Sequence, residues 1–149
     1  MALLELKNLK TFFETKRGTV KAVNGVSYSL EAGQVLGVVG ESGSGKSVSA
    51  MSILRLLDGN GYIDSGEILF NGQDLTKLSI NDMYKIRGNE ISVIFQEPMT
   101  SLNPVFTVSK QISEPLMIHQ GMTKRQAAKK AIELLSNVKI PNPEVVAKQ

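Results

Sequence analysis

The stretch that most restricts how this chain can fold is an apolar run followed by a glycine-rich turn and a helical pattern. Val35 to Val39 reads VLGVV, a continuous apolar run typical of a strand buried on both faces. Residues 40–47 read GESGSGKS. After them, apolar residues recur at every third position until the turn-forming sequence at 58–61: Val48, Met51, Leu54 and Leu57. This order of strand, loop and helix predicts an α/β fold.

The loop itself has the residue types that bind phosphate. Residues 40–47 fit the spacing G-x-x-x-x-G-K-[ST]. Glycines let the backbone turn sharply and bring its N–H groups inward, at a helix N-terminus that attracts anions. Lys46 would reach the β- and γ-phosphates, and the Ser47 hydroxyl would ligate Mg²⁺. We therefore predict a site for a nucleoside triphosphate with Mg²⁺, formed by Gly40, Ser42, Gly43, Ser44, Gly45, Lys46, Ser47 and Val48.

Two other interpretations of this loop are less well supported. A Gly/Ser-rich surface turn would have the same composition, but the apolar run before the loop and the helical pattern after it favour the phosphate site. A dinucleotide site is excluded because Gly40, Gly43 and Gly45 miss the spacing G-x-G-x-x-G.

A second polar position also follows an apolar run. Ile91 to Phe95 reads ISVIF, another buried-strand pattern, and Gln96 comes directly after it. Ligands of open α/β sheets collect at such strand ends, and an amide oxygen there would ligate Mg²⁺ or orient water. We interpret the neighbouring Glu97 as a solvated loop residue, so no residue is assigned as a general base.

Shorter patterns predict the remaining elements. Strands are expected over 3–8, over 20–30 with a break near 24–25, and over 66–70, with turns at 15–18 and 71–72. A short helix is expected over 82–87. Thr123 and Gln126 match a capping box that opens a further helix, which ends by Pro141. Its apolar stripe is Ala127, Ala128, Ala131, Ile132, Leu135 and Val138.

Composition excludes several classes of protein. The 149 residues are 42% apolar and 21% charged, which is ordinary for a globular chain. No apolar run approaches the roughly 20 residues of a membrane span. The absence of Cys excludes disulfides and thiolate metal sites and favours a cytosolic protein. A net charge of 17 − 14 = +3 with 5% aromatic residues offers no concentrated basic face, so we expect no nucleic-acid partner.

Two segments together resemble the ATP-binding subunit of an ABC transporter, of the oligopeptide or dipeptide importer type. They are VVGESGSGKS at Val38 to Ser47 and IFQEPMTSLNP at Ile94 to Pro104. The resemblance implies a P-loop NTPase core with an N-terminal antiparallel β-subdomain and the phosphate loop over residues 1–105. The start of a helical subdomain would follow over 106–149. It also implies that Gln96 binds Mg²⁺ and senses the γ-phosphate, and that Phe13 stacks on adenine, with Phe12 as the competing candidate.

The same resemblance implies partners and a location. The loop after Gln96 would contact membrane-spanning permease subunits, and a second ATPase subunit would complete the ATP site. The protein would be cytoplasmic and peripheral, on the inner face of the cell membrane.

Several motifs of the family have no match here. The Walker B strand with its catalytic Glu and the LSGGQ signature are absent, and His119 lies before the expected place of the switch histidine. We therefore expect the N-terminal half of such a subunit, truncated before the signature and Walker B. Alone it would bind Mg-ATP weakly at best without hydrolysing it, and Val35 to Val39 would be an unpaired edge. The alternative is a stand-alone, non-hydrolysing nucleotide-binding or regulatory module; a P-loop kinase would need an acceptor site and a base that we do not find.

Overall fold

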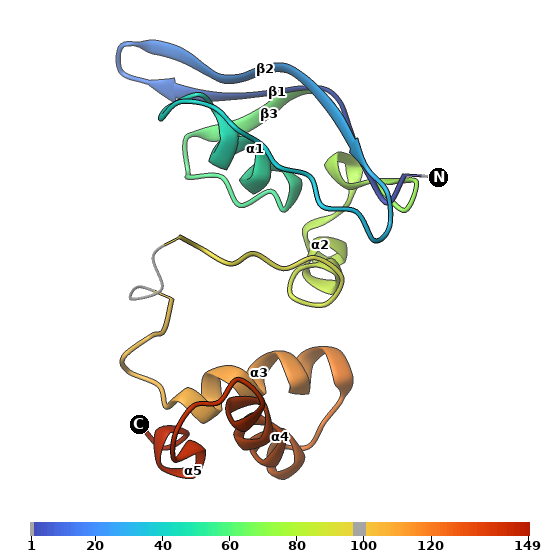
Figure 1. Cartoon of the computed structure of the whole chain (residues 1–149). Coiled ribbons are helices and arrows are strands. Elements are labelled where there is room, and N and C mark those ends of the chain that lie inside the picture. The colour runs from blue at the N-terminus through green and yellow to red at the C-terminus, as the bar shows by residue number, and fades with distance from the viewer. Residues whose placement is uncertain (1, 97–100) are drawn as a thin grey trace. The chain divides into compact units, whose positions relative to one another are not determined.

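The computed structural model describes residues 2–96 and 101–149. The chain divides into two compact units, Met1–Met83 and Tyr84–Gln149 (Figure 1). The first unit contains β1 (Leu4–Thr15), β2 (Gly18–Leu30), α1 (Lys46–Ile53), β3 (Gly61–Phe70), β4 (Gln73–Asp74) and the 3₁₀ turn η1 (Leu75–Lys77). Helix α2 (Ile80–Ile86) spans the boundary, and the second unit contains α3 (Val108–Gln120), α4 (Lys124–Asn137) and α5 (Pro143–Val146).

The first unit is built on an antiparallel sheet with the strand order β2-β1-β3-β4. This confirms the predicted N-terminal antiparallel β-subdomain. Strands β1 and β2 form a hairpin in which Thr15 pairs with Gly18, so the predicted turn between them is confirmed. The turn at Asn71-Gly72 joins β3 to β4, also as predicted.

Strands β1 and β2 are longer than their patterns predicted. The prediction that the first strand ends at Asn8 is wrong, because β1 continues through Asn8 with a register shift between Leu6 and Leu9. Asn8 has a φ of 48°, and a side-chain carbon at Gly66 of β3 would lie 2.5 Å from the Asn8 carbonyl oxygen. The expected break near Asn24-Gly25 is likewise an irregularity inside β2. A bulge inside a strand and the end of a strand use the same turn-forming residues, so the local sequence does not distinguish them.

Helix α1 is joined to the sheet by a buried polar contact. The hydroxyls of Thr11 on β1 and Ser52 on α1 lie 2.8 Å apart, and both residues are fully buried. Leu6, Leu9 and Ile68 form the apolar core of the sheet around them. The helix ends at Ile53, earlier than the pattern predicted, since Arg55 has a φ of 52° and no helix continues through that conformation.

Both predictions of a buried central strand are wrong. Residues 34–40 form no strand, and Val35 and Val39 are 98% and 95% exposed. Residues 92–95 form none either, and Ile94 is 98% exposed; Ile91 makes a single bridge to Arg87. A strand exists only when a neighbour accepts and donates its backbone hydrogen bonds. Within residues 2–96 and 101–149, neither run has such a neighbour along its length.

The second unit is helical. Helix α4 begins after the predicted capping box of Thr123 and Gln126, and it buries Ala127, Ala131 and Leu135 at intervals of four residues. Val138 does not belong to the buried stripe, because it lies at the C-cap and is 69% exposed. Helix α3 was not predicted. No helix in the described ranges has both the length and the apolar character needed to cross a bilayer.

Candidate functional site

The glycine-rich loop connects Val39 to helix α1, and Gly45 is its most constrained residue. Gly45 is the N-cap of α1 and has a φ of 87°, in the left-handed region. A side-chain carbon at this position would overlap the carbonyl oxygen of Ala22 on β2 and would lie 3.6 Å from a methyl group of Val23. Both the backbone conformation and the close approach of β2 therefore require glycine.

Four backbone N–H groups around the start of α1 have no acceptor within the described structure: those of Gly43, Gly45, Lys46 and Ser47. No side chain in the described part of the chain caps the helix, and its first turn has no acidic residue that would compete for these donors. Unsatisfied N–H groups at a helix N-terminus carry partial positive charge, so they attract an anion.

Lys46 adds a formal positive charge beside these donors. Its ammonium donates hydrogen bonds to the carbonyl oxygens of Gly40 and Glu41, each at 2.6 Å, and lies 3.3 Å from the Ser44 hydroxyl. The side chain therefore folds back over its own loop instead of extending into solvent. The loop thus combines an ammonium with free amide donors, an arrangement suited to phosphate.

The other predicted ligands lie in different settings. Ser47 is exposed at the start of α1, and its hydroxyl has no hydrogen bond within the described residues. Ser42 is exposed, and Val48 is half-buried on the first turn of the helix. Gln96 is exposed in a bend of the second unit, so its role toward the metal stays a prediction. Glu97 lies outside the described residues.

The two adenine-stacking candidates differ in burial. Phe12 is 8% exposed, and its ring meets that of Tyr62 edge-on at a centroid distance of 6.3 Å. Phe13 is half-buried, and its ring lies against the backbone of Gly61. Phe13 thus exposes more of its ring than Phe12 does.

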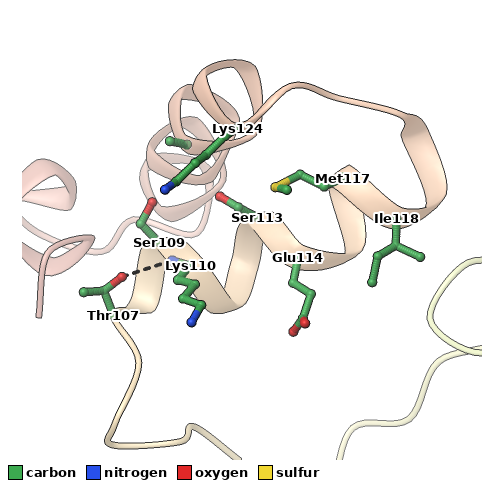
Figure 2. Close-up of a pocket in the computed structure, with 9 residues that line it drawn as sticks. Thr107, Ser109, Lys110, Ser113, Glu114, Met117, Ile118 and Lys124 are labelled. Carbon is green, nitrogen blue, oxygen red and sulfur yellow. Dashed lines mark hydrogen bonds between the residues drawn. The ribbon is translucent and has the colours of Figure 1, made fainter.

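A separate cavity of about 580 Å³ lies between α3 and α4 in the second unit (Figure 2). It contains none of the predicted ATP ligands. Its lining combines the apolar side chains of Met117, Ile118 and Ala128 with those of Lys110 and Lys124. The Ser113 hydroxyl in its wall is buried and has no hydrogen-bond partner among the residues that the structure describes.

Sequence reasoning missed the atoms that hold Lys46. Two of them are backbone carbonyl oxygens, which no residue type identifies in advance. The third, the Ser44 hydroxyl, was predicted as an ATP ligand, whereas in this structure it contacts the ammonium. The packing of Ala22 against Gly45 was missed as well, because it joins residues far apart in the sequence.

Known proteins resemble this chain over most of its length. The profile of the ABC transporter family matches residues 23–149. The chain is 52% identical over 144 residues to a dipeptide transport ATP-binding protein, DppD, of Lactococcus lactis subsp. cremoris. It is 51% identical over 143 residues to an oligopeptide transport ATP-binding protein, OppD, of Bacillus subtilis. These matches cover 96% and 95% of this chain but only 41% and 40% of the two relatives.

Solved structures match the fold. The dimeric structure of MJ0796, described as a bacterial ABC transporter cassette, aligns with a TM-score of 0.78 at 22% identity. It covers 98% of this chain, which spans 60% of that cassette. A second structure of the same cassette, with ADP and Pi bound, aligns with a TM-score of 0.79 at 23% identity. At these identities the likeness concerns the fold alone.

Proposed function

Because this chain belongs to the ABC transporter family, we propose that it supplies the phosphate-binding part of the energy-coupling ATPase subunit of a peptide importer. The names of the relatives above support the peptide importer: they are transport ATP-binding proteins for dipeptides and oligopeptides. The chain spans about 41% of the length of the first of them. ATP hydrolysis that drives transport is therefore proposed for the complete subunit, and ATP binding for this chain.

One observation carries the proposal for ATP. Gly43, Gly45, Lys46 and Ser47, whose N–H groups have no acceptor within the described structure, belong to the same loop as the ammonium of Lys46. The polyphosphate of ATP carries several negative charges and many acceptor oxygens, so it can use all of these donors at once. The Gly45 contact with β2 holds the loop in the conformation that presents them.

The residues present also fit Mg²⁺. This ion takes oxygen ligands in an octahedron and usually binds through one or two protein groups together with substrate phosphates. The Ser47 hydroxyl has no competing hydrogen bond within the described structure and lies at the helix start. We propose Ser47 as one ligand and the amide oxygen of Gln96 as another. When bound, Mg²⁺ would neutralise charge on the phosphate oxygens.

For the base of ATP, we propose that Phe13 provides the stacking surface. Phe13 is half-buried and its ring lies against Gly61, so the residue is packed on one neighbour while part of it stays accessible. An aromatic ring can stack on adenine without a specific hydrogen-bond pattern. Phe12 is the weaker candidate because its ring is already in the core.

For the partners, we propose that the segment after Gln96 contacts the membrane-spanning permease subunits. Its described part exposes apolar side chains: Leu102 is 52% exposed and Val105 is 82% exposed. It leads through Thr107 into the wall of the cavity between α3 and α4 (Figure 2). An amphipathic helix binds such an apolar groove through its own apolar face. A second ATPase subunit, and a cytoplasmic location on the inner face of the cell membrane, follow from the same assignment.

The test is nucleotide binding by the chain with a charge-matched control. Lys46→Ala removes the ammonium from the loop, whereas Lys129→Ala removes an exposed ammonium from α4 in the other unit. We expect Lys46→Ala to weaken Mg-ATP binding by at least about tenfold, the loss typical of a charged hydrogen-bond partner. Lys129→Ala should bind like the wild type. Equal affinities of all three proteins for Mg-ATP would refute the proposed site.

A further inference from the structure

The ammonium of Lys46 is fully occupied by oxygen atoms of its own loop. An ammonium has three N–H donors. The carbonyl oxygens of Gly40 and Glu41 lie 2.6 Å from Nζ, and the Ser44 hydroxyl oxygen lies 3.3 Å from it. Each donor therefore has an acceptor before any ligand binds. A phosphate oxygen cannot simply be added to this arrangement; it must replace one of the three.

The Ser44 hydroxyl is the partner that is easiest to replace. Its distance to Nζ is the longest of the three, and it lies at the end of a side chain that can rotate. The two carbonyl groups are part of the backbone and make shorter bonds. A phosphate oxygen is charged, so its hydrogen bond with an ammonium is stronger than that of a neutral hydroxyl.

The Ser44 hydroxyl lies close to the backbone of Gly40. A side-chain carbon at Gly40 would lie 2.7 Å from the Ser44 Oγ and 3.7 Å from the Lys46 Cδ. The Ser44 hydroxyl and the Lys46 side chain therefore both lie over the backbone of residue 40.

We infer that Ser44 is a positioning residue for Lys46. Its hydroxyl accepts a hydrogen bond from the third N–H of the ammonium while the loop is free, and a phosphate oxygen replaces the hydroxyl as the acceptor when a triphosphate binds. The carbonyl groups of Gly40 and Glu41 keep the ammonium in place throughout. This inference rests on the proposed function, because it assumes a triphosphate as the incoming ligand.

The first experiment tests the hydrogen bond between Lys46 and Ser44 in the absence of nucleotide. In the chain labelled with ¹⁵N at the lysine Nζ atoms, NMR measures how fast each ammonium exchanges its protons with water; Lys46→Ala identifies the Lys46 signal. We expect roughly two- to tenfold faster exchange at Lys46 in Ser44→Ala, the change that one hydrogen bond of ordinary strength produces. Ser42→Ala, the same substitution at an exposed serine of this loop, should leave the rate unchanged. Equal rates at Lys46 in wild type and Ser44→Ala would overturn the inference.

The second experiment measures Mg-ATP affinity to test whether a phosphate oxygen replaces the Ser44 hydroxyl. Ser44→Ala should bind Mg-ATP roughly two- to tenfold more tightly, because no hydroxyl competes for the ammonium. Ser136→Ala, the same substitution at an exposed serine of α4, should bind like the wild type, and Ser44→Thr, which keeps a hydroxyl, should bind less tightly than Ser44→Ala. Weaker binding by Ser44→Ala would show that the hydroxyl stabilises the bound phosphate, which contradicts the inference. Absence of Mg-ATP binding by every form would defeat the proposed function and the exchange step with it, whereas unchanged proton exchange in Ser44→Ala defeats the inference alone.

Discussion

Replacing Gly45 by alanine tests whether the phosphate loop is held by its contact with strand β2. The substitution adds one methyl group at a residue with two constraints. Its φ of 87° is unfavourable for any residue with a side chain, and its new carbon would overlap the Ala22 carbonyl oxygen and lie 3.3 Å from the carbonyl carbon. The backbone of β2 cannot move aside without breaking its pairing with β1, in which Val23 is opposite Thr11.

The expected loss of stability is the sum of two effects. A left-handed conformation costs a residue with a Cβ about 1–2 kcal/mol. Forcing extra volume into a packed site costs about 1–3 kcal/mol more. Gly43 provides the matched control, because it lies in the same loop with a φ of 80° but has open space around the added carbon. Gly43→Ala should therefore show only the first cost, and the gain from a less flexible unfolded chain is the same for both variants.

Urea denaturation followed by far-UV circular dichroism measures this difference, and it suits a chain without tryptophan. We expect Gly45→Ala to be less stable than Gly43→Ala by about 1–3 kcal/mol, the overlap contribution alone. We also expect Gly45→Ala to lose Mg-ATP binding more completely, since the loop must shift to relieve the overlap. Equal losses of stability in the two variants would refute the argument that β2 holds the loop.

Two further predictions concern the carboxyl of Asp74 and the aromatic pair on β1. Burial raises the pKa of Asp74, but hydrogen bonds from Lys77 and Thr76 lower it by more, so the pKa lies below its ordinary value of 3.8. Asp74→Asn should thus reduce stability by about 0.5–1 kcal/mol at pH 7. The difference in stability between the two proteins should disappear as the pH falls below about 4, because the Asp74 carboxylate of the wild type then becomes protonated and no longer stabilises the fold. Urea titrations at several pH values measure this. Phe13→Ala should weaken ATP binding about tenfold but leave tripolyphosphate binding unchanged, since stacking is worth about 1–3 kcal/mol. Phe12→Ala should instead lower the free energy of unfolding, measured in urea, by about 3–5 kcal/mol. If Phe12→Ala, and not Phe13→Ala, weakened the binding of ATP relative to tripolyphosphate, Phe12 would be the stacking residue.

Features whose chemistry is local could be predicted from the sequence. The phosphate loop needs particular residues at fixed spacing, and residues 40–47 contain all of them. The capping box of Thr123 and Gln126 also depends on near neighbours and was confirmed. Of the predicted stripe of α4, Ala127, Ala131 and Leu135 are buried, Ala128 and Ile132 are half-buried, and Val138 is exposed. The hairpin turn at 15–18 is local in the same way.

Features that depend on distant partners could not be predicted. Val35 to Val39 and Ile91 to Phe95 have the composition of buried strands, but a strand also requires a paired neighbour, and neither has one in the described ranges. The break expected near Asn24-Gly25 is a bulge, since pairing with β1 continues on both sides of it. Helix α3 has local signals, Thr107 as N-cap and Gly121 as C-cap, but Pro115 lies inside it, where proline is usually a helix breaker, so it was missed. The carbonyl groups that hold Lys46 became visible only once the loop was folded.

The central claim is that backbone amides of the loop bind a triphosphate together with Lys46. The most direct measurement is a titration of the ¹⁵N-labelled chain with Mg-ATP, followed by the amide signals of Gly43, Gly45, Lys46 and Ser47. We predict that these signals shift together along one saturation curve, and that Lys46→Ala moves the curve to at least about tenfold higher ATP concentration. The account would be contradicted if the amide signals of the loop did not shift while ATP saturated the chain, and only signals from α3 and α4 shifted.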